Sequence, residues 1–126
     1  MNSGFTLAAQ LVLPGKGVIG VCGDGGMMMH LYVMEMAKEY KLPVTYVVMN
    51  NACLGNVMDF QAPGRRIAAR YASPNFAKIA QGFDIKGIRV EGPAELRPAL
   101  SKALELNEPV VVDIATADYP HFKMRP

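Results

Sequence analysis

Apolar residues gather in four short runs along this chain, at positions 18–22, 44–49, 85–90 and 109–114. The first run lies between glycines and leads into a Gly-Asp-Gly turn, which is typical of a buried strand. The second is almost continuously apolar, as parallel strands covered on both faces are. The pattern therefore predicts four strands that form a mainly parallel sheet.

The stretch between the first two runs, residues 26–40, has apolar residues at helical spacing. These residues occupy more than one side of the expected helix: Met27, Met28, Leu31 and Met34 on one side, and Met29, Val33 and Met36 on others. A helix with apolar residues on most sides is a buried helix. Strand, helix and strand in this order predict a right-handed crossover.

Two more helices are predicted between the later runs. One is expected to start with Ser73 as N-cap and Pro74 as its first residue, and to stop at Gly82. The other covers 93–106, where Pro98 predicts a distorted first turn or a late start.

The alternation of strands and helices predicts an α/β fold, with an open, mainly parallel sheet and helices on both faces. We expect one domain that covers residues 1–126. Ligands of such sheets bind beyond the carboxyl ends of the strands. The stretch 52–72 has no clear period and is interpreted as a candidate lid.

Composition excludes several function classes. With 13 Lys and Arg against 11 Asp and Glu, and no basic stripe, the chain is not expected to bind nucleic acid. No apolar stretch is long enough to span a membrane. Cys22 and Cys53 follow no metal-ligand spacing, so both are expected to be thiols in a cytoplasmic protein.

Polar residues with distinctive chemistry follow the first two predicted strands. Gly23, Asp24 and Gly25 end the first strand, and Asn50 and Asn51 end the second. Neighbouring parallel strands would place these residues side by side, with Asp24 and Asn51 exposed at the strand ends. Carboxylate and carboxamide oxygens are hard ligands that suit Mg²⁺, which often shares its coordination with substrate phosphates.

The start of the first predicted helix adds a candidate phosphate site. The backbone N–H groups of Gly26 and Met27 would be free there, and we expect them to receive the phosphates that the metal bridges. Gly25 and Gly26 would open this helix, and glycine is needed there because a β-carbon would block the close approach of the backbone to a ligand.

Gly-Asp-Gly, 24 intervening residues and then Asn50-Asn51 together resemble the signature of thiamine diphosphate enzymes. The resemblance covers residues 17–114. The segments 40–44 and 50–55 are most similar to the branch that holds acetolactate synthase and pyruvate oxidase. The fold implied is the thiamine diphosphate-binding fold.

This resemblance implies a cofactor site with Mg²⁺ and thiamine diphosphate. Asp24 and the side-chain oxygen of Asn51 would bind the metal, together with the backbone carbonyl of Cys53. Val57 would line the thiazolium and substrate side. The remaining implied contacts to the diphosphate come from the glycine turn and the residue after it: Gly23, Gly25, Gly26 and Met27.

The implied activity is that of a transferase or lyase which decarboxylates or carboligates 2-oxo acids. In the family, a glutamate on a pyrimidine-binding domain activates the cofactor, and we expect that domain to be absent from this chain. The glutamates of this chain lie at predicted helix surfaces or element ends, so no catalytic residue is assigned. The resemblance thus implies half of an active site, inactive alone, with a homo-oligomer or a pyrimidine-binding-domain subunit as partner.

Three departures from the family pattern stand out. The segment 3–11 looks like a shortened version of the Gly-rich loop and helix that contact the aminopyrimidine ring. Val33 stands where many relatives have glutamate, and Asn56 replaces a usually apolar residue. None of these positions is a proposed metal ligand.

Two other functions stay open at this level. One is a non-catalytic fragment or interaction module of the same fold, which associates with other proteins. With either function, the chain is expected to form an oligomer or bind a partner through 27–29 and the first predicted helix. The other is a flavodoxin-like or nucleotide-binding domain, which fits the architecture but does not explain the spacing of the motifs.

Overall fold

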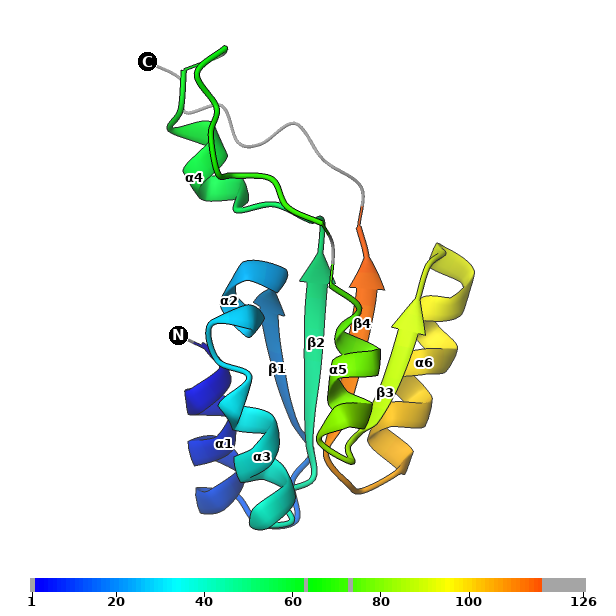
Figure 1. Cartoon of the computed structure of the whole chain (residues 1–126). Helices are drawn as coiled ribbons and strands as arrows, with labels where there is room; N and C mark the ends of the chain where they lie inside the picture. Colours follow the sequence, from blue (N-terminus) through cyan, green and yellow to red (C-terminus); the bar gives the residue numbers. More distant parts are fainter. Residues whose placement is uncertain (1, 63, 73, 117–126) are drawn as a thin grey trace.

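The computed structural model describes residues 2–62, 64–72 and 74–116, which form an alternating α/β arrangement (Figure 1). The strands are β1 (Val18–Gly23), β2 (Val44–Asn50), β3 (Lys86–Val90) and β4 (Val110–Ala115). The helices are α1 (Asn2–Val12), α2 (Asp24–Met28), α3 (Tyr32–Glu39), α4 (Gly55–Asp59), α5 (Phe76–Gly82) and α6 (Pro93–Glu105).

The four strands form one parallel sheet in the order β1-β2-β4-β3. Gly23 pairs with Met49, and Asn50 pairs with Ala115, so the carboxyl ends of β1, β2 and β4 lie at one edge. The prediction of a parallel sheet is confirmed. The edge where ligands are expected is formed by the residues that follow these ends.

Helices cover both faces of the sheet, as predicted. One core cluster joins α1, α3 and α5 to the sheet: Leu7, Met27, Val33, Met34, Ala37, Val44, Tyr46, Val48, Phe76, Ala80, Ile85 and Val111. The other joins α6 to the opposite face: Val47, Val90, Ala99, Ala103, Val110 and Val112. Consecutive β2 residues alternate between these clusters, because side chains of a strand point to opposite faces in turn.

The helix expected over 26–40 is instead two helices, α2 and α3. The His30 ring Nδ1 lies 2.9 Å from the Gly26 carbonyl oxygen, which would accept the His30 backbone N–H in an uninterrupted helix. That N–H bonds the Met27 carbonyl instead, at 2.9 Å. A side chain inserted into the hydrogen-bond ladder is a known cause of a break.

The same helices are buried on one side only, so the expectation of burial on most sides was wrong. Met27 and Met34 are fully buried, whereas Met28 and Met36 are each 41% exposed. The amphipathic pattern of α3 is obscured in the sequence because methionine occupies both sides.

The start of α5 also differs from the prediction. Asn75 is the N-cap, and its side chain accepts a hydrogen bond from the backbone N–H of Lys78 at 2.8 Å. Ser73 lies outside the described residues, and Pro74 precedes the helix. Gly82 does end it, as expected. In α6, the first residue is Pro93, so Pro98 does not delay the start.

Candidate functional site

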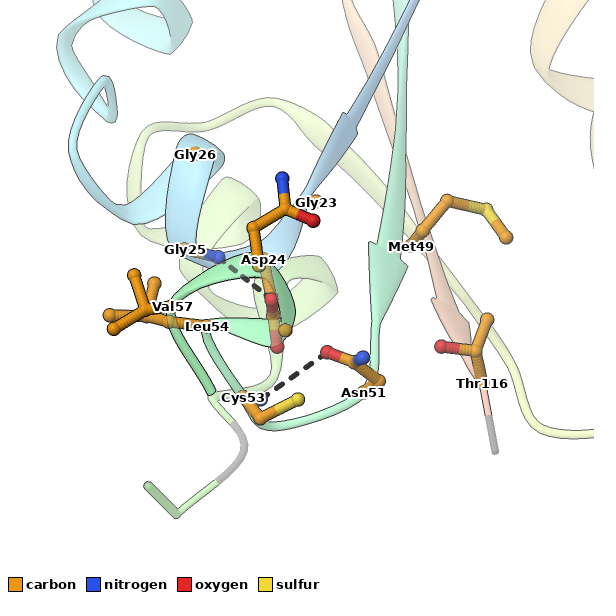
Figure 2. A pocket seen from close by; sticks show the side chains of 12 residues that line it. Gly23, Asp24, Gly25, Gly26, Met49, Asn51, Cys53, Leu54, Val57 and Thr116 are labelled. Carbon is orange, nitrogen blue, oxygen red and sulfur yellow. Dashed lines mark hydrogen bonds between the residues drawn. The ribbon is translucent and has the colours of Figure 1, made fainter. Parts of the chain in front are cut away.

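A cavity of about 380 Å³ opens at the carboxyl edge of β1 and β2 (Figure 2). Its lining comes from the ends of both strands, from α2, from α4 and from the residue after β4: Gly23, Asp24, Gly25, Gly26, Met49, Asn51, Cys53, Leu54, Gly55, Asn56, Val57 and Thr116. The structure therefore brings together every predicted site residue except Met27. That residue is fully buried in the core under α2.

Asp24 lies at the first position of α2 and is buried, with 2% of its surface exposed. The expectation of an exposed carboxylate at the strand end was wrong, because α2 and the following segment close over it. Its Oδ1 accepts a hydrogen bond from the Gly25 backbone N–H at 2.8 Å. Its Oδ2 is buried and has no hydrogen-bond partner among the described residues. An unpaired buried carboxylate oxygen is costly, and it marks a place where a ligand would be stabilised.

Asn51 follows β2 and faces Asp24 across the two strand ends (Figure 2). Its Oδ1 accepts one hydrogen bond, from the Cys53 backbone N–H at 3.3 Å. Ala52, between them, has φ of 58°, which turns the chain back so that Cys53 lies under the cavity with 3% exposure. A carboxamide oxygen has two lone pairs, so a second interaction remains available to Asn51.

The glycines of the turn have two different roles. A β-carbon on Gly25 would lie 2.4 Å from the Leu54 Cδ2 atom, so Gly25 makes room for a side chain of this protein. A β-carbon on Gly23 or Gly26 would meet nothing within 4 Å. Because both of these line the cavity, their lack of a side chain leaves the open space that a ligand needs.

The candidate lid, residues 52–72, contains α4 and is fixed at its base. The Leu54 backbone N–H bonds the Ala69 carbonyl at 2.8 Å, and the Tyr71 N–H bonds the Ala52 carbonyl at 3.2 Å. Figure 1 shows the segment beyond the carboxyl ends of the strands. Its far part is exposed, with Phe60 at 79% and Ile67 at 73%. Lid movement remains a prediction.

Tyr71 is a site residue that the sequence did not reveal. Its hydroxyl is buried without a hydrogen-bond partner among the described residues, and lies 3.4 Å from where a β-carbon on Gly25 would be. Burial, and then the neighbouring Asp24 carboxylate, raise the pKa of Tyr71 well above its usual range, so the hydroxyl keeps its proton. A single tyrosine in a segment without periodicity gives no local signal of this position.

Other candidate groups are not near the cavity. The glutamates that the sequence places on surfaces are all exposed: Glu35, Glu39, Glu91, Glu95, Glu105 and Glu108. Among the described residues, no group of three or more His, Cys, Asp or Glu side chains can hold a metal. A cation at this edge would therefore need amide and carbonyl oxygens beside Asp24.

Comparison with known proteins accounts for this arrangement. The family model "Thiamine pyrophosphate enzyme, C-terminal TPP binding domain" matches residues 2–114. The chain belongs to this family. Thiamine pyrophosphate and thiamine diphosphate are the same compound, so the resemblance inferred from the Gly-Asp-Gly and Asn-Asn motifs is confirmed.

Members of the family with curated descriptions are similar over most of this chain. YdaP of Bacillus subtilis, described as a thiamine pyrophosphate-containing protein, is 37% identical over 116 residues, which are 90% of this chain and 20% of that protein. The large subunit of acetolactate synthase isozyme 3 of Escherichia coli is 34% identical over 122 residues, 91% of this chain and 21% of that subunit. The chain thus spans about a fifth of the length of these relatives.

A solved structure has the same fold. The thiamine diphosphate-dependent 4-hydroxybenzoylformate decarboxylase of Rhodococcus jostii RHA1 superposes with a TM-score of 0.85 at 25% identity, over 92% of this chain and 23% of that one. The chain is a thiamine pyrophosphate-binding C-terminal domain of the acetolactate synthase-like kind. Within its described residues, no helix is long and apolar enough to cross a membrane.

Proposed function

We propose that this domain binds thiamine diphosphate together with Mg²⁺, as the diphosphate-side half of an enzyme that decarboxylates or carboligates 2-oxo acids. The observation that carries the proposal is the unpaired, buried Oδ2 of Asp24 at the edge of an open cavity. A negative oxygen without a donor is suited to a cation, and family membership supports the cofactor that accompanies it.

The donor set around the cavity suits Mg²⁺. Asp24 Oδ2, the side-chain oxygen of Asn51 and the backbone carbonyl of Cys53 would hold the cation. All three are hard oxygen ligands, and Mg²⁺ in proteins usually completes about six oxygens with water and substrate phosphates. The cation would offset the charge of Asp24, which otherwise stays unpaired in the interior.

The cavity also has room for the diphosphate beside the cation. Gly23 and Gly26 line it without side chains. The backbone N–H groups of Gly26 and Met27 lie in the first turn of α2, where no earlier helix residue provides a carbonyl to accept from them. Met27 would contribute through its backbone alone, since its side chain belongs to the core. Leu54 and Val57 provide the apolar wall on which the thiazolium would lie.

The cofactor, when bound, supplies the chemistry at the substrate carbonyl carbon. The residues of this chain would bind and orient it. The exposed glutamates lie at the surface, so the group that activates the cofactor would come from a pyrimidine-binding domain. The purified chain is therefore expected to show no turnover of pyruvate above background.

An exposed apolar surface on α2 and α3 supports association with such a partner. Five large apolar side chains there are 41–71% exposed: Met28, Met29, Tyr32, Met36 and Tyr40. Exposed apolar patches of this kind mark interfaces, and methionine adapts to the shape of a partner. The same surface favours the second candidate, a module that associates without cofactor.

Titration calorimetry separates these functions. The wild-type chain is expected to bind thiamine diphosphate only when Mg²⁺ is present, and EDTA should abolish the heat. Asp24→Asn and Asn51→Ala should each remove binding. Asp59→Asn makes the same chemical change as Asp24→Asn at an exposed position, and it should not remove binding. Unchanged affinity in either site variant would mean that the metal site is wrongly assigned. A wild-type chain that associates but binds no cofactor would support the second candidate.

Two neighbouring methionines test the partner surface. Met28→Lys adds a charge to the exposed patch, and sedimentation at low protein concentration should find a folded monomer. Met27→Lys adds the same charge to the core, and the chain should unfold, as judged by circular dichroism. Wild-type chain that stays monomeric at high concentration and binds no hydrophobic dye would contradict this role for the patch.

A further inference from the structure

Asp113, near the carboxyl end of β4, is a fully buried carboxylate outside the cavity lining. Its Oδ1 accepts a hydrogen bond from the Asn50 side-chain amide at 3.0 Å. Its Oδ2 accepts two more, from the Phe76 backbone N–H at 2.8 Å and from Arg89 Nη1 at 2.7 Å. One carboxylate therefore joins β2, β3 and β4 to the first residue of α5.

Both ends of the segment that carries half of the candidate site are held by this network. Asn50 directly precedes Asn51, and its amide also donates to the Pro74 carbonyl at 2.8 Å. The Asn50 backbone carbonyl accepts from the Thr116 N–H at 2.9 Å. Pro74 and Phe76 stand where the chain returns from the lid. The network thus connects the point where the segment leaves β2 to the point where it enters α5.

The register of the sheet relates this anchor to Asp24. Gly23 pairs with Met49, so Asp24 and Asn50 are the next residues along neighbouring strands. Because Asn51 follows Asn50 directly, holding Asn50 in place also holds Asn51 in its position opposite Asp24. The Phe76 and Arg89 bonds satisfy one oxygen of Asp113, while the other is used for Asn50 alone.

We infer that Asp113 is a positioning residue for the cofactor site: through Asn50 and the start of α5 it holds the segment that bears Asn51 and Cys53 in register with Asp24. The inference rests on the proposed function of that site. Residues that orient metal ligands without contacting the metal typically contribute about 10-fold to 100-fold to metal affinity, which is lost when they are substituted.

The test compares Asp113→Asn with a matched control on the same strand. Val110→Ala removes buried volume at the opposite end of β4, so it lowers stability without touching the network. Both variants are studied at a temperature where circular dichroism shows them folded. Hydrogen exchange of the backbone N–H groups of residues 51–59 is measured without ligand, and the affinity for thiamine diphosphate with Mg²⁺ by calorimetry.

Asp113→Asn is expected to speed exchange in residues 51–59 and to weaken binding by about tenfold or more, while Val110→Ala leaves both as in the wild type. Wild-type exchange and affinity in Asp113→Asn, or equal losses in Val110→Ala, would overturn the inference. If the wild type binds no cofactor, the proposed function fails, and the exchange rates still decide whether Asp113 holds the segment.

A second variant covers the case in which Asp113→Asn does not fold. Asn50→Ala removes the link to the segment but keeps the Asp113 bonds to Phe76 and Arg89. It should reproduce the faster exchange and the weaker affinity. Unchanged values in Asn50→Ala would overturn the positioning role as well.

Discussion

Replacing Asp24 with asparagine is expected to stabilise the cofactor-free protein while it removes cation binding. The carboxylate is 2% exposed and its Oδ2 has no partner among the described residues, so the folded state holds a buried carboxylate oxygen without a donor. Asparagine keeps the oxygen that accepts the Gly25 N–H at 2.8 Å. Its amide group replaces the unpaired oxygen and carries no charge.

The expected size follows from the cost of an unsatisfied buried group, which is about 1–3 kcal/mol. The amide nitrogen that takes the place of Oδ2 is uncharged but still needs a partner, so only part of this cost is recovered. We therefore expect the free energy of unfolding to rise by about 1–2 kcal/mol, or roughly 3–10 °C in midpoint for a domain of this size.

The assay is thermal unfolding followed by circular dichroism, first in EDTA and then with Mg²⁺ and thiamine diphosphate. Ligand at about 100 times its dissociation constant should stabilise the wild type by about 2.7 kcal/mol and leave Asp24→Asn unchanged. The order of the two midpoints should thus reverse when ligand is added. Asp59→Asn should show the same rise in midpoint on addition of ligand as the wild type.

Two outcomes would refute this reasoning. A lower midpoint for Asp24→Asn in EDTA would mean that Oδ2 is well paired in solution. Equal stabilisation of both proteins by the ligand would mean that the cation, if it binds, does so elsewhere.

Three further predictions concern the scaffold and can be checked by chemical denaturation. Gly87→Ala should destabilise by several times more than Gly25→Ala, because its β-carbon would lie 2.1 Å from a carbonyl oxygen of α5, while that of Gly25 meets side-chain atoms of Leu54 and Tyr71, which can move. Similar losses would contradict this. Tyr71→Phe removes an unpaired buried hydroxyl and should raise the cofactor-free stability by up to about 1 kcal/mol, and a clear loss would show that the hydroxyl is paired. The Lys38 ammonium lies 2.6 Å from the Asp84 carboxylate and lowers the pKa of Asp84. The pair therefore stabilises the fold fully above the pKa of Asp84 in the unfolded chain, about 3.9, and this stabilisation is lost as pH falls through the lower pKa of Asp84 in the folded state. The stability difference between wild type and Asp84→Asn should accordingly be constant near neutral pH and vanish in acid, and a difference that grows in acid would contradict the pairing.

Most of the fold could be predicted because the strands are short, apolar and separated by turns. Each of the four runs became a parallel strand, and the motif residues met at one edge because consecutive strands β1 and β2 are neighbours. Helix ends were harder. Asn75 and Ser73 are both good N-caps by residue type, and only the position of α5 against β3 and β4 selects between them.

The candidate site was predicted where it depends on strand ends and missed where it depends on long-range contacts. Asp24 and Asn51 follow from the motif, but the burial of Asp24 comes from α2 and from the returning segment. Tyr71 reaches Asp24 only because backbone bonds pair 52 with 71 and 54 with 69. Asp113 has no motif at all, and its role is visible only once its partners from β2, β3 and α5 are located.

The position of β1 at the rim of the sheet affects how the isolated chain can be handled. Within the described residues, β1 pairs with β2 and with no other strand. On the face opposite α1, Ile19 is 47% exposed and Val21 50%. An open strand rim with apolar side chains is a template for adding strands of other molecules, which leads to aggregation. Purified chain is therefore expected to aggregate on concentration, and Ile19→Lys is the substitution by which solubility would be recovered without touching the cofactor cavity.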